Sequence, residues 1–556
     1  MGQTKTLPDD TSAEVNLLEQ RLTSPTVSLI LAGSILGAAI YMFFLLQPSY
    51  RGDILPYLMV IIAEAFLISQ GILSFWTILS GRSNPRHFEY HNAQNALFGQ
   101  RNGKSIATYL HEHPIEDTRA VQMYLHSKKV TVDVFIPVYG EPVEEIRDTA
   151  IAARDMYGLH KTYILDDGES DEVKAMAKEV GVGYLRRPRH DHAKAGNINY
   201  ALQHTSGEFF IILDADFVAK REFIYEALPF FEDAQMAMVQ TPQYYNNAMN
   251  FVSTAAGYMQ HVFYSMVMAG KNRFNAAFCV GTCVMFRREA IEEIHGMYDK
   301  SKSEDIWTSL KLHENGWKTI YINRVMAEGK TPETIKAYSK QQLRWATGSF
   351  EIFLKKNPLF NAKLTADQRL QYFLTTSFYF TGFATFALLL LPALQIYFNI
   401  SPISLTIPLW QWSLLYSGFF IMQMMLSFYA MGGLKIETIM IAAASYPIYI
   451  KAFFNALFGR DVAWSATNAK DNGYDSPFNY IRIQTYTFLF LLLTSAVGIW
   501  KIFYTSEFSI AVVWNVLMTI IFWYFIRAAR REGRELKREA RRVRQLAKKQ
   551  IKVEGV

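Results

Sequence analysis

The chain has few cysteines and few charged residues for its length of 556 residues. The only cysteines are Cys279 and Cys283, too few for a zinc cluster or a disulfide framework, so we expect both to be reduced. Charged residues make up 19% of the chain and glycine only 31 positions, whereas 50% of the residues are hydrophobic. These values exclude collagen-like and wholly disordered proteins.

The net charge of +6 is concentrated at one end of the chain. Residues 527–552 contain twelve Lys or Arg and three Glu, which leaves the rest of the chain slightly acidic. The positive charge therefore belongs to a tail, 527–556, and we expect no nucleic-acid partner. This tail is either a solvated, partly helical extension or rests on anionic lipid, because it directly follows an apolar run.

Hydrophobic residues are bunched into runs long enough to cross a membrane, so we expect a lipid membrane as a partner. Two runs come first, Pro25–Leu46 and Ile54–Leu79, and a long segment without such a run follows. The later runs are Gln371–Phe398, Leu405–Met431, Ile436–Leu457, Gln484–Phe503 and Phe508–Phe525.

The distribution of positive charge decides how many of these runs are spans. The segment with Arg82 and Arg86 and the basic tail should both be cytoplasmic, which requires an even number of spans. The run Ile436–Leu457 contains Pro447 and Lys451, so we interpret it as an amphipathic helix at the membrane interface. Six spans then place both termini and the central domain on the cytoplasmic side of the plasma (inner) membrane.

The expected spans divide the chain into four parts. An N-terminal segment with two spans covers 1–80, and a cytosolic domain with interfacial helices covers 81–368. A membrane domain covers 369–526 and includes the interfacial helix 436–457 and a loop at 460–476. The basic tail covers 527–556.

Short β-rich runs alternate with helix-like stretches in the central domain. We expect strands at Val130–Val138, Thr162–Leu165, Phe209–Leu213 and Met236–Val239. This alternation predicts an α/β domain with a mostly parallel sheet covered by helices. Ligands of such sheets bind beyond the carboxyl ends of the strands, and acidic residues follow two of these ends.

Asp214 and Asp216 directly follow the third expected strand. From that turn both carboxylates can reach one hard cation, Mg²⁺ or Mn²⁺, which could neutralise a nucleotide diphosphate leaving group. Most pairs with this spacing are solvated turns, so the position after the strand gives the pattern its weight.

Two further stretches carry groups suited to phosphate binding and proton transfer. Lys194 lies beside a glycine turn after a basic stretch, where it could bind phosphate oxygens or belong to a solvated loop. Glu304 and Asp305 precede a helix that begins near Ile306. A carboxylate there is usually a helix cap, but one that points into a cleft could be a general base for an attacking hydroxyl.

Gln341, Arg344 and Trp345 have the spacing i, i+3 and i+4, so they share one face of a predicted helix. An amide, a guanidinium and an indole on one face suit a diphosphate and a stacked sugar ring. The alternative is a helix packed at the membrane interface, where Trp and Arg are common.

Together these motifs resemble those of the processive family-two glycosyltransferases, and within them the bacterial cellulose synthase group of β-glucan synthases. The family pattern D, DxD, TED and QxxRW is present as Asp166-Asp167-Gly168, Asp214-Ala215-Asp216, Ser303-Glu304-Asp305 and Gln341-Gln342-Leu343-Arg344-Trp345. The resemblance covers roughly Val130 to Tyr372. It implies a glycosyltransferase domain of the GT-A type, inserted in an α-helical membrane domain.

The resemblance implies donor-binding and metal-binding roles. Asp166 and Asp167 would hold the uridine of a UDP-sugar. Lys194, together with Asp216 and the metal, would hold the diphosphate. Asp214 and Asp216 would be the metal ligands.

It also implies roles in the reaction and in acceptor binding. Asp305, beside Glu304, would deprotonate the acceptor hydroxyl. Gln341 and Arg344 would contact the diphosphate or the acceptor, and Trp345 would stack on the acceptor sugar. Gly281 and Thr282 stand where cellulose synthases carry a Phe-Phe-Cys-Gly-Ser pattern near the acceptor, but the pattern differs here and leaves the linkage open.

Three other features bear on the resemblance. Ser303 replaces the usual Thr and keeps the hydroxyl. Trp464, Thr467 and Lys470 resemble the FxVTxK gating loop, with one extra residue, and would close over the bound donor. About 30 residues follow the last span, too few for a cyclic-di-GMP-binding β-barrel, so we expect no regulation of that kind within this chain.

The implied function is processive, inverting polymerisation of glucose from UDP-glucose into a β-glucan, with Mg²⁺ or Mn²⁺ as cofactor. The spans would pass the growing polysaccharide across the membrane, and an export partner protein is left open. One alternative is a hyaluronan-type or chitin-type synthase that uses UDP-N-acetylglucosamine. Others are a transferase that loads one sugar onto a membrane lipid, and a transporter or scaffold with an inactive transferase domain.

Overall fold

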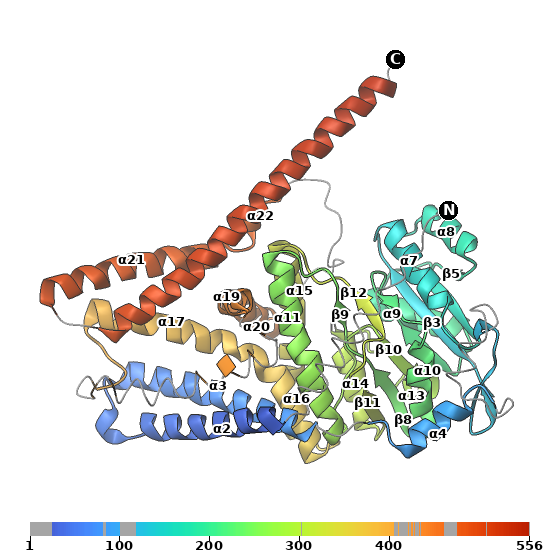
Figure 1. The fold of residues 1–556 in the computed structure, drawn as a ribbon, viewed down its shortest axis with the longest axis horizontal. Coiled ribbons are helices and arrows are strands. Elements are labelled where there is room, and N and C mark those ends of the chain that lie inside the picture. The colour runs from blue at the N-terminus through green and yellow to red at the C-terminus, as the bar shows by residue number, and fades with distance from the viewer. Residues whose placement is uncertain are drawn as a thin grey trace.

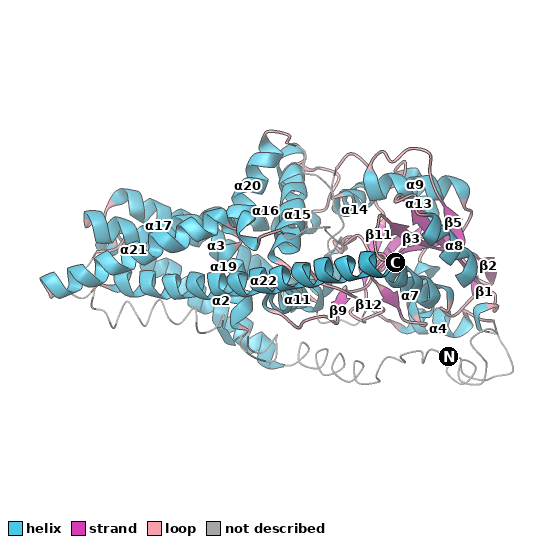
Figure 2. Ribbon diagram, turned by 90° about the horizontal axis from the view of Figure 1, so that it is seen from above, coloured by secondary structure: helices cyan, strands magenta, loops and turns pink. Residues whose placement is uncertain are grey.

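The computed structural model describes residues 25–81, 85–99, 118–301, 303–404, 435–460, 475–506 and 509–554, with a few positions between 405 and 434. The expected gating-loop residues Trp464, Thr467 and Lys470 lie outside the described residues. Most of the run Leu405–Met431 does so as well. At one end of the molecule strands and helices form an α/β domain, and at the other end there are only helices (Figures 1 and 2).

A seven-stranded sheet forms the centre of the α/β domain. Its strands in spatial order are β11 (Lys318–Tyr321), β8 (Met236–Gln240), β10 (Val284–Arg287), β6 (Phe209–Ile212), β3 (Val132–Val138), β4 (His160–Asp166) and β5 (Gly183–Leu185). Only β10 is antiparallel to its neighbours. The expected mostly parallel sheet is thus confirmed, and the four strands predicted from the sequence are β3, β4, β6 and β8.

Side chains alternate between the two faces of the sheet along each strand, and helices cover both faces, so both are buried. Val134, Ile136 and Ile211 belong to one hydrophobic cluster, which α7 (Val143–Arg154) and α8 (Asp171–Val180) cover. Phe135 and Phe210 belong to a second cluster. The helices that cover it are α9 (Ala193–His204), α13 (Arg288–Glu293) and α14 (Glu304–Glu314).

The register brings the ends of three neighbouring parallel strands to one edge. Val138 at the end of β3 lies opposite Asp166 at the end of β4, and Phe135 lies opposite Ile212 at the end of β6. A small second sheet, in the order β7 (Val218–Ala219), β12 (Ala327–Gly329) and β9 (Tyr244–Tyr245), lies beyond this edge. These short strands are not predicted by the sequence pattern.

Six helices of the described chain are long and apolar enough to cross a membrane. Five match expected spans: α2 (Pro25–Leu45), α3 (Ile54–Ser80), α16 with α17 (Ala366–Ser377 and Thr381–Phe398), α21 (Arg482–Thr505) and α22 (Ile510–Glu554). In Figure 1, α2, α3, α17 and α21 extend away from the α/β domain.

The sixth candidate, Ile436–Leu457, is the segment that we interpret as interfacial. It is divided into α19 (Ile436–Ala444) and α20 (Tyr446–Leu457), with the break just before Pro447. Figure 1 looks nearly along the axis of α19, whereas the neighbouring spans lie in the plane of the view. Length and composition alone would permit a span here, so the interfacial placement stays a prediction.

The last apolar run and the basic tail form one continuous helix, α22, of 45 residues. The helical form expected for part of the tail is therefore confirmed. Beyond the bundle α22 projects away from the other spans (Figure 1). Arg530, Arg534 and Lys537 are exposed on it.

A buried ion pair lies at the amino end of β3, far from the carboxyl ends of the strands. Asp133 in β3 accepts hydrogen bonds from Gly207 N at 2.7 Å and from Arg288 Nη2 at 3.0 Å. Both side chains are buried. Removing one charge of such a pair leaves the other without compensation in a medium of low polarity.

We therefore predict that Asp133→Asn lowers the free energy of unfolding by about 3 kcal/mol, because Arg288 keeps its buried charge. Thermal unfolding of the detergent-purified protein measures this. Asp148→Asn, at an exposed position on α7, is the matched control. Equal unfolding temperatures for the two variants would contradict the prediction.

Candidate active site

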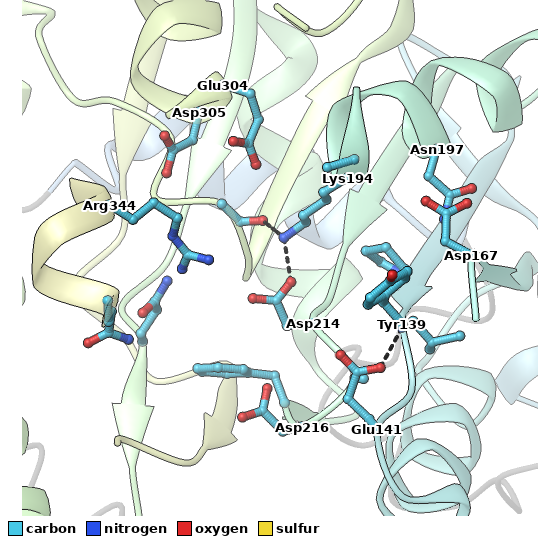
Figure 3. Close-up of a pocket in the computed structure, with 18 of the residues that line it drawn as sticks. Tyr139, Glu141, Asp167, Lys194, Asn197, Asp214, Asp216, Glu304, Asp305 and Arg344 are labelled. Atoms are coloured by element: carbon cyan, nitrogen blue, oxygen red, sulfur yellow. Dashed lines mark hydrogen bonds and ion pairs between the residues drawn. The ribbon is translucent and has the colours of Figure 1, made fainter. Parts of the chain in front are cut away.

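A cavity with a volume of about 340 Å³ opens at the carboxyl ends of β3, β4 and β6. Ten of the residues predicted from the sequence line it: Asp167, Lys194, Asp214, Asp216, Gly281, Glu304, Asp305, Gln341, Arg344 and Trp345. Figure 3 shows that carboxylates from several elements surround this space, with Lys194 between them and Arg344 opposite. Motifs that are far apart in the sequence thus form one site.

Two predicted residues lie outside the cavity lining. Asp166 is buried, and its carboxylate accepts hydrogen bonds from Gly168 N at 2.8 Å, Ser170 N at 2.9 Å and the Tyr184 hydroxyl at 2.6 Å. Its oxygens therefore shape the loop after β4 and are not directed at a ligand. Here Asp167 alone of the pair reaches the cavity, and it forms a buried ion pair with Arg187 at 2.7 Å.

Thr282 is the second of these residues. It is fully buried, and its Oγ1 accepts a hydrogen bond from Asp214 N at 2.8 Å. The Thr282 hydroxyl thus contacts the backbone of a predicted metal ligand, and its contact with the acceptor stays a prediction. Gly281, the neighbouring predicted residue, does line the cavity.

Lys194 stands in the first turn of α9 and links two elements of the site. Its Nζ donates hydrogen bonds to the Asp214 carboxylate and to Gly281 O, the latter at 2.6 Å. Burial by itself would lower the pKa of Lys194, but the charges of Asp214 and Glu304 outweigh this and raise its pKa. Lys194 is therefore a permanent positive charge at the centre of the cavity.

Asp214 and Asp216 follow β6 and line the cavity, as expected. Burial, with the nearby charge of Asp214, raises the pKa of Asp216 to about 7. A divalent cation would relieve this repulsion, and carboxylate oxygens are the ligands that Mg²⁺ and Mn²⁺ prefer. No group of three or more His, Cys, Asp or Glu suited to a metal occurs in the described residues, so a cation here would need ligands from substrate or water as well.

Glu304 and Asp305 form the first turn of α14 and line the cavity. Asp305 Oδ1 accepts a hydrogen bond from its neighbour Ile306 N at 2.8 Å, and the rest of the carboxylate is directed into the cavity (Figure 3). Burial and the charge of Glu304 raise the pKa of Asp305 to about 7, and burial also raises that of Glu304. A carboxylate with a pKa near neutrality is suited to accept a proton.

Gln341, Arg344 and Trp345 lie on α15 (Ile335–Lys355) and all three line the cavity. The start of this helix is fixed from three directions. Thr334 caps it by accepting from Ala337 N, Lys336 pairs with Asp475 at 2.9 Å, and Glu532 of α22 accepts from Ile335 N at 3.0 Å. The sequence gives no indication that the tail helix contacts this motif.

Helix α15 also determines where the acidic pair can lie. Ser303, directly before Glu304, is packed against Gly348 of α15, and a Cβ atom on Gly348 would overlap its hydroxyl. Ser303 is buried, so it has little room to move away. Because Arg344 stands one helical turn earlier on α15, this contact fixes the distance between the acidic pair and the guanidinium.

Sequence reasoning missed the residue that holds the loop 279–283. Gln240 at the end of β8 is fully buried, and its Oε1 accepts from Val280 N at 3.0 Å. Its Nε2 donates to Thr282 O at 2.8 Å and to Thr241 O at 2.8 Å. A polar residue at the end of an apolar strand was the only signal that could have identified it.

Comparisons with known proteins find a family model, relatives in sequence and similar solved structures. Residues 209–431 match a family model described as glycosyl transferase family group 2. A catalytic subunit of cellulose synthase 1 (UDP-forming) from Komagataeibacter xylinus is 36% identical over 263 residues, which are 45% of this chain and 35% of that protein. The cellulose synthase catalytic subunit (UDP-forming) of Pseudomonas fluorescens is 35% identical over 278 residues, 48% of this chain and 38% of that protein.

The chain thus spans less than two fifths of the length of these curated relatives. Among solved structures, a mannosyltransferase from Pyrobaculum calidifontis in complex with GDP-Man and Mn²⁺ is similar, with a TM-score of 0.46 and 15% sequence identity. This similarity covers 72% of this chain and all of that one.

The contact between Ser303 and Gly348 leads to a test. We predict that Gly348→Ala lowers the turnover number roughly 10- to 100-fold, because it displaces Glu304 and Asp305 from the α15 face. The matched control is Gly257→Ala on α11 (Phe251–Val262), where nothing lies within 4 Å of the added Cβ atom. Rates of sugar transfer by purified protein distinguish the two, and unchanged turnover in Gly348→Ala would disprove the spacing role.

The arrangement of motifs and the relatives lead to the same conclusion. The matched segment, 209–431, includes the two carboxylates after β6 and the pair Glu304 and Asp305. It also includes the residues of α15 that line the cavity. The described helices add a multi-pass membrane region beside this domain. Residues 209–431 thus match the model of glycosyl transferase family group 2, and the chain is a multi-pass membrane protein that is similar in sequence to catalytic subunits of bacterial cellulose synthase.

Proposed function

We propose that this chain is a processive, inverting glycosyltransferase that polymerises glucose from UDP-glucose into a β-glucan and passes the product through its own membrane domain. The observation that carries the proposal is the gathering of all the chemical groups of such a reaction in one cavity beside the membrane helices. The relatives support the choice of donor and product, since they are named UDP-forming cellulose synthases.

The donor would enter at the carboxyl ends of β3 and β4. Asp167 lines this part of the cavity, and the pair with Arg187 keeps its carboxylate in a fixed orientation for the uracil or ribose. Lys194 and Arg344 are the cations that would bind the diphosphate oxygens. Lys194 already has its ammonium group fixed by two hydrogen bonds before any ligand binds.

Asp214 and Asp216 would hold a divalent cation, Mg²⁺ or Mn²⁺. When bound, the cation supplies positive charge to the diphosphate as it leaves. The two carboxylates fit this role because they lie close together and are partly shielded from water, so that burial and the charge of Asp214 raise the pKa of Asp216. The neighbouring Lys194 would then share the remaining phosphate charge with Arg344.

Asp305 would act as the general base. It would accept the proton from the acceptor hydroxyl while the hydroxyl oxygen attacks the anomeric carbon of the donor sugar. The bond from that carbon to the phosphate oxygen breaks in the same step, and the electron pair leaves with UDP. One in-line displacement of this kind inverts the configuration, so an α-linked donor gives a β-linked product.

The position of α15 supports processive transfer. This helix lies between the α/β domain and the membrane helices (Figure 1), and its Tyr338 hydroxyl hydrogen bonds with Ser445, between α19 and α20, at 2.9 Å. Trp345 on the same helix lines the cavity, where its indole can stack on the terminal sugar of the acceptor. A product bound there has the membrane domain directly behind it.

The charge pattern supports a cytoplasmic location of the catalytic domain. The exposed Arg530, Arg534 and Lys537 follow the last apolar run, and the positive-inside rule places them in the cytoplasm. The α/β domain lies on the same side of the bundle as this part of α22 (Figure 1).

The first test is the product. We predict that membrane vesicles with Mg²⁺ or Mn²⁺ incorporate radiolabelled sugar from UDP-glucose, and not from UDP-N-acetylglucosamine, into material of high molecular weight. Digestion with glucanases specific for β-1,4 or β-1,3 bonds then identifies the linkage. A short, lipid-extractable product would contradict processivity, and incorporation from UDP-N-acetylglucosamine would indicate a hyaluronan-type or chitin-type synthase instead.

The second test is the general base. A base must be deprotonated, and the pKa of Asp305 is raised to about 7, so we predict that kcat/KM falls tenfold for each pH unit below about 7. Asp305→Asn, which has no basic carboxylate, should reduce turnover by roughly 10²- to 10⁴-fold at every pH. A variant that keeps the wild-type rate would show that Asp305 is not the general base.

A further inference from the structure

The loop 279–283 contacts both partners of the central ion pair. Gly281 O accepts a hydrogen bond from Lys194 Nζ at 2.6 Å, and Thr282 Oγ1 accepts one from Asp214 N at 2.8 Å. Gly281 has a φ of +91°, a conformation that glycine adopts readily and other residues rarely adopt, so the carbonyl direction depends on glycine at this turn. The position of the Lys194 ammonium group therefore depends on what holds this loop.

A chain of side chains holds the loop from the side of the second sheet. Gln243 Nε2 donates to Val280 O at 2.8 Å, and the Tyr245 hydroxyl donates to Gln243 Oε1 at 2.5 Å. The same hydroxyl also meets the side-chain amide of Gln260 on α11. Gln243, Tyr245 and Val280 all line the cavity.

The Tyr245 hydroxyl has one hydrogen and cannot donate it to two amide oxygens. The hydroxyl keeps its proton, because burial raises the pKa of Tyr245 well above its ordinary value. Gln260 is buried, and its Nε2 has no hydrogen-bond partner among the residues that the structure describes. Rotating the Gln260 amide by half a turn exchanges an oxygen–oxygen contact for a hydrogen bond from Nε2 to the phenol.

The direction of the whole chain then follows. Gln260 donates to Tyr245, Tyr245 donates to Gln243, and Gln243 donates to Val280 O. The next carbonyl along the chain, Gly281 O, faces Lys194. Three hydrogen bonds thus connect α11 to Val280 O, and the Val280–Gly281 peptide and a fourth hydrogen bond continue the connection to the ammonium group of Lys194.

We propose that Tyr245 is a positioning residue for glycosyl transfer, which acts through Gln243 and the Val280–Gly281 peptide to hold Lys194 against Asp214. This inference rests on the proposed transferase function of the cavity. The tyrosine ring has a separate role, since it packs edge-on against Phe217, with the ring centroids 6.0 Å apart. The hydroxyl and the ring can therefore be tested separately.

Tyr245→Phe removes the hydroxyl and keeps the ring. We expect kcat/KM for the UDP-sugar to fall about tenfold, the effect of one lost hydrogen bond, with an unchanged unfolding temperature. The half-saturating concentration of Mn²⁺ should rise several-fold, because Asp214 loses a fixed partner. A residue with only a structural role would change the stability and leave the Mn²⁺ dependence as it is.

The matched control is Tyr321→Phe in β11. This variant also removes a buried phenol hydroxyl, which has no hydrogen-bond partner in the described part of the chain, and Tyr321 does not line the cavity. It should keep the wild-type kcat/KM and Mn²⁺ dependence. Equal behaviour of the two variants would overturn the proposal.

A double-mutant cycle tests the chain itself. Gln243→Leu should cost about as much as Tyr245→Phe, and the double variant should be no worse than either single one, because all three interrupt the same series of bonds. Additive losses would show that the residues act separately and would overturn the proposal.

Binding measurements separate this inference from the proposed function. In the Asp305→Asn background, the affinity for UDP with Mn²⁺ should be lowered by Tyr245→Phe and unaffected by Tyr321→Phe. If wild-type vesicles make no polymer but this difference in UDP affinity is present, the proposed function fails and the positioning role stands. If polymer forms and the affinity difference is absent, the positioning role fails alone.

Discussion

The ion pair between Lys194 and Asp214 is the interaction on which the rest of the site depends. Asp216, Glu304 and Asp305 share the same partly enclosed cavity; burial and the charge of Asp214 raise the pKa of Asp216, and burial and the charge of Glu304 raise the pKa of Asp305. Gathering like charges away from water costs free energy unless a cation is held among them. The surrounding elements, α9, the loop 279–283 and the turn after β6, all serve to keep one ammonium group in place.

The single antiparallel strand explains how this loop reaches the cation. The strand β10 runs between β6 and β8 in the opposite direction, so it begins beside their carboxyl ends. The loop 279–283, which precedes β10, therefore lies at this edge of the sheet. A parallel strand in that place would bring its own end to the edge and leave its beginning on the far side of the sheet. Gln240 at the end of β8 can therefore bind the loop backbone, and Thr282 can meet Asp214.

The sequence was sufficient for the alternation of strands and helices and for ten of the 26 residues that line the cavity. Apolar runs with acidic ends identify β4 and β6, since burial and strand termination are local properties of the chain. The roles of Asp166 and Thr282 could not be read in this way, because their hydrogen bonds depend on how two loops fold back. The contact of Ser303 with Gly348 could not be predicted either, because the two residues lie 45 positions apart and meet only through the packing of α15 against the loop before α14.

Helix α22 connects the membrane region to the helices beside the candidate active site. Its Glu532 accepts a hydrogen bond from Ile335 N at the start of α15, and its Phe525 packs against Phe251 of α11. A bilayer of different thickness changes the tilt of a spanning helix. A change in the tilt of α22 would therefore act on α15, which lines the cavity, so the thickness of the surrounding lipid would affect the positions of Arg344 and Trp345.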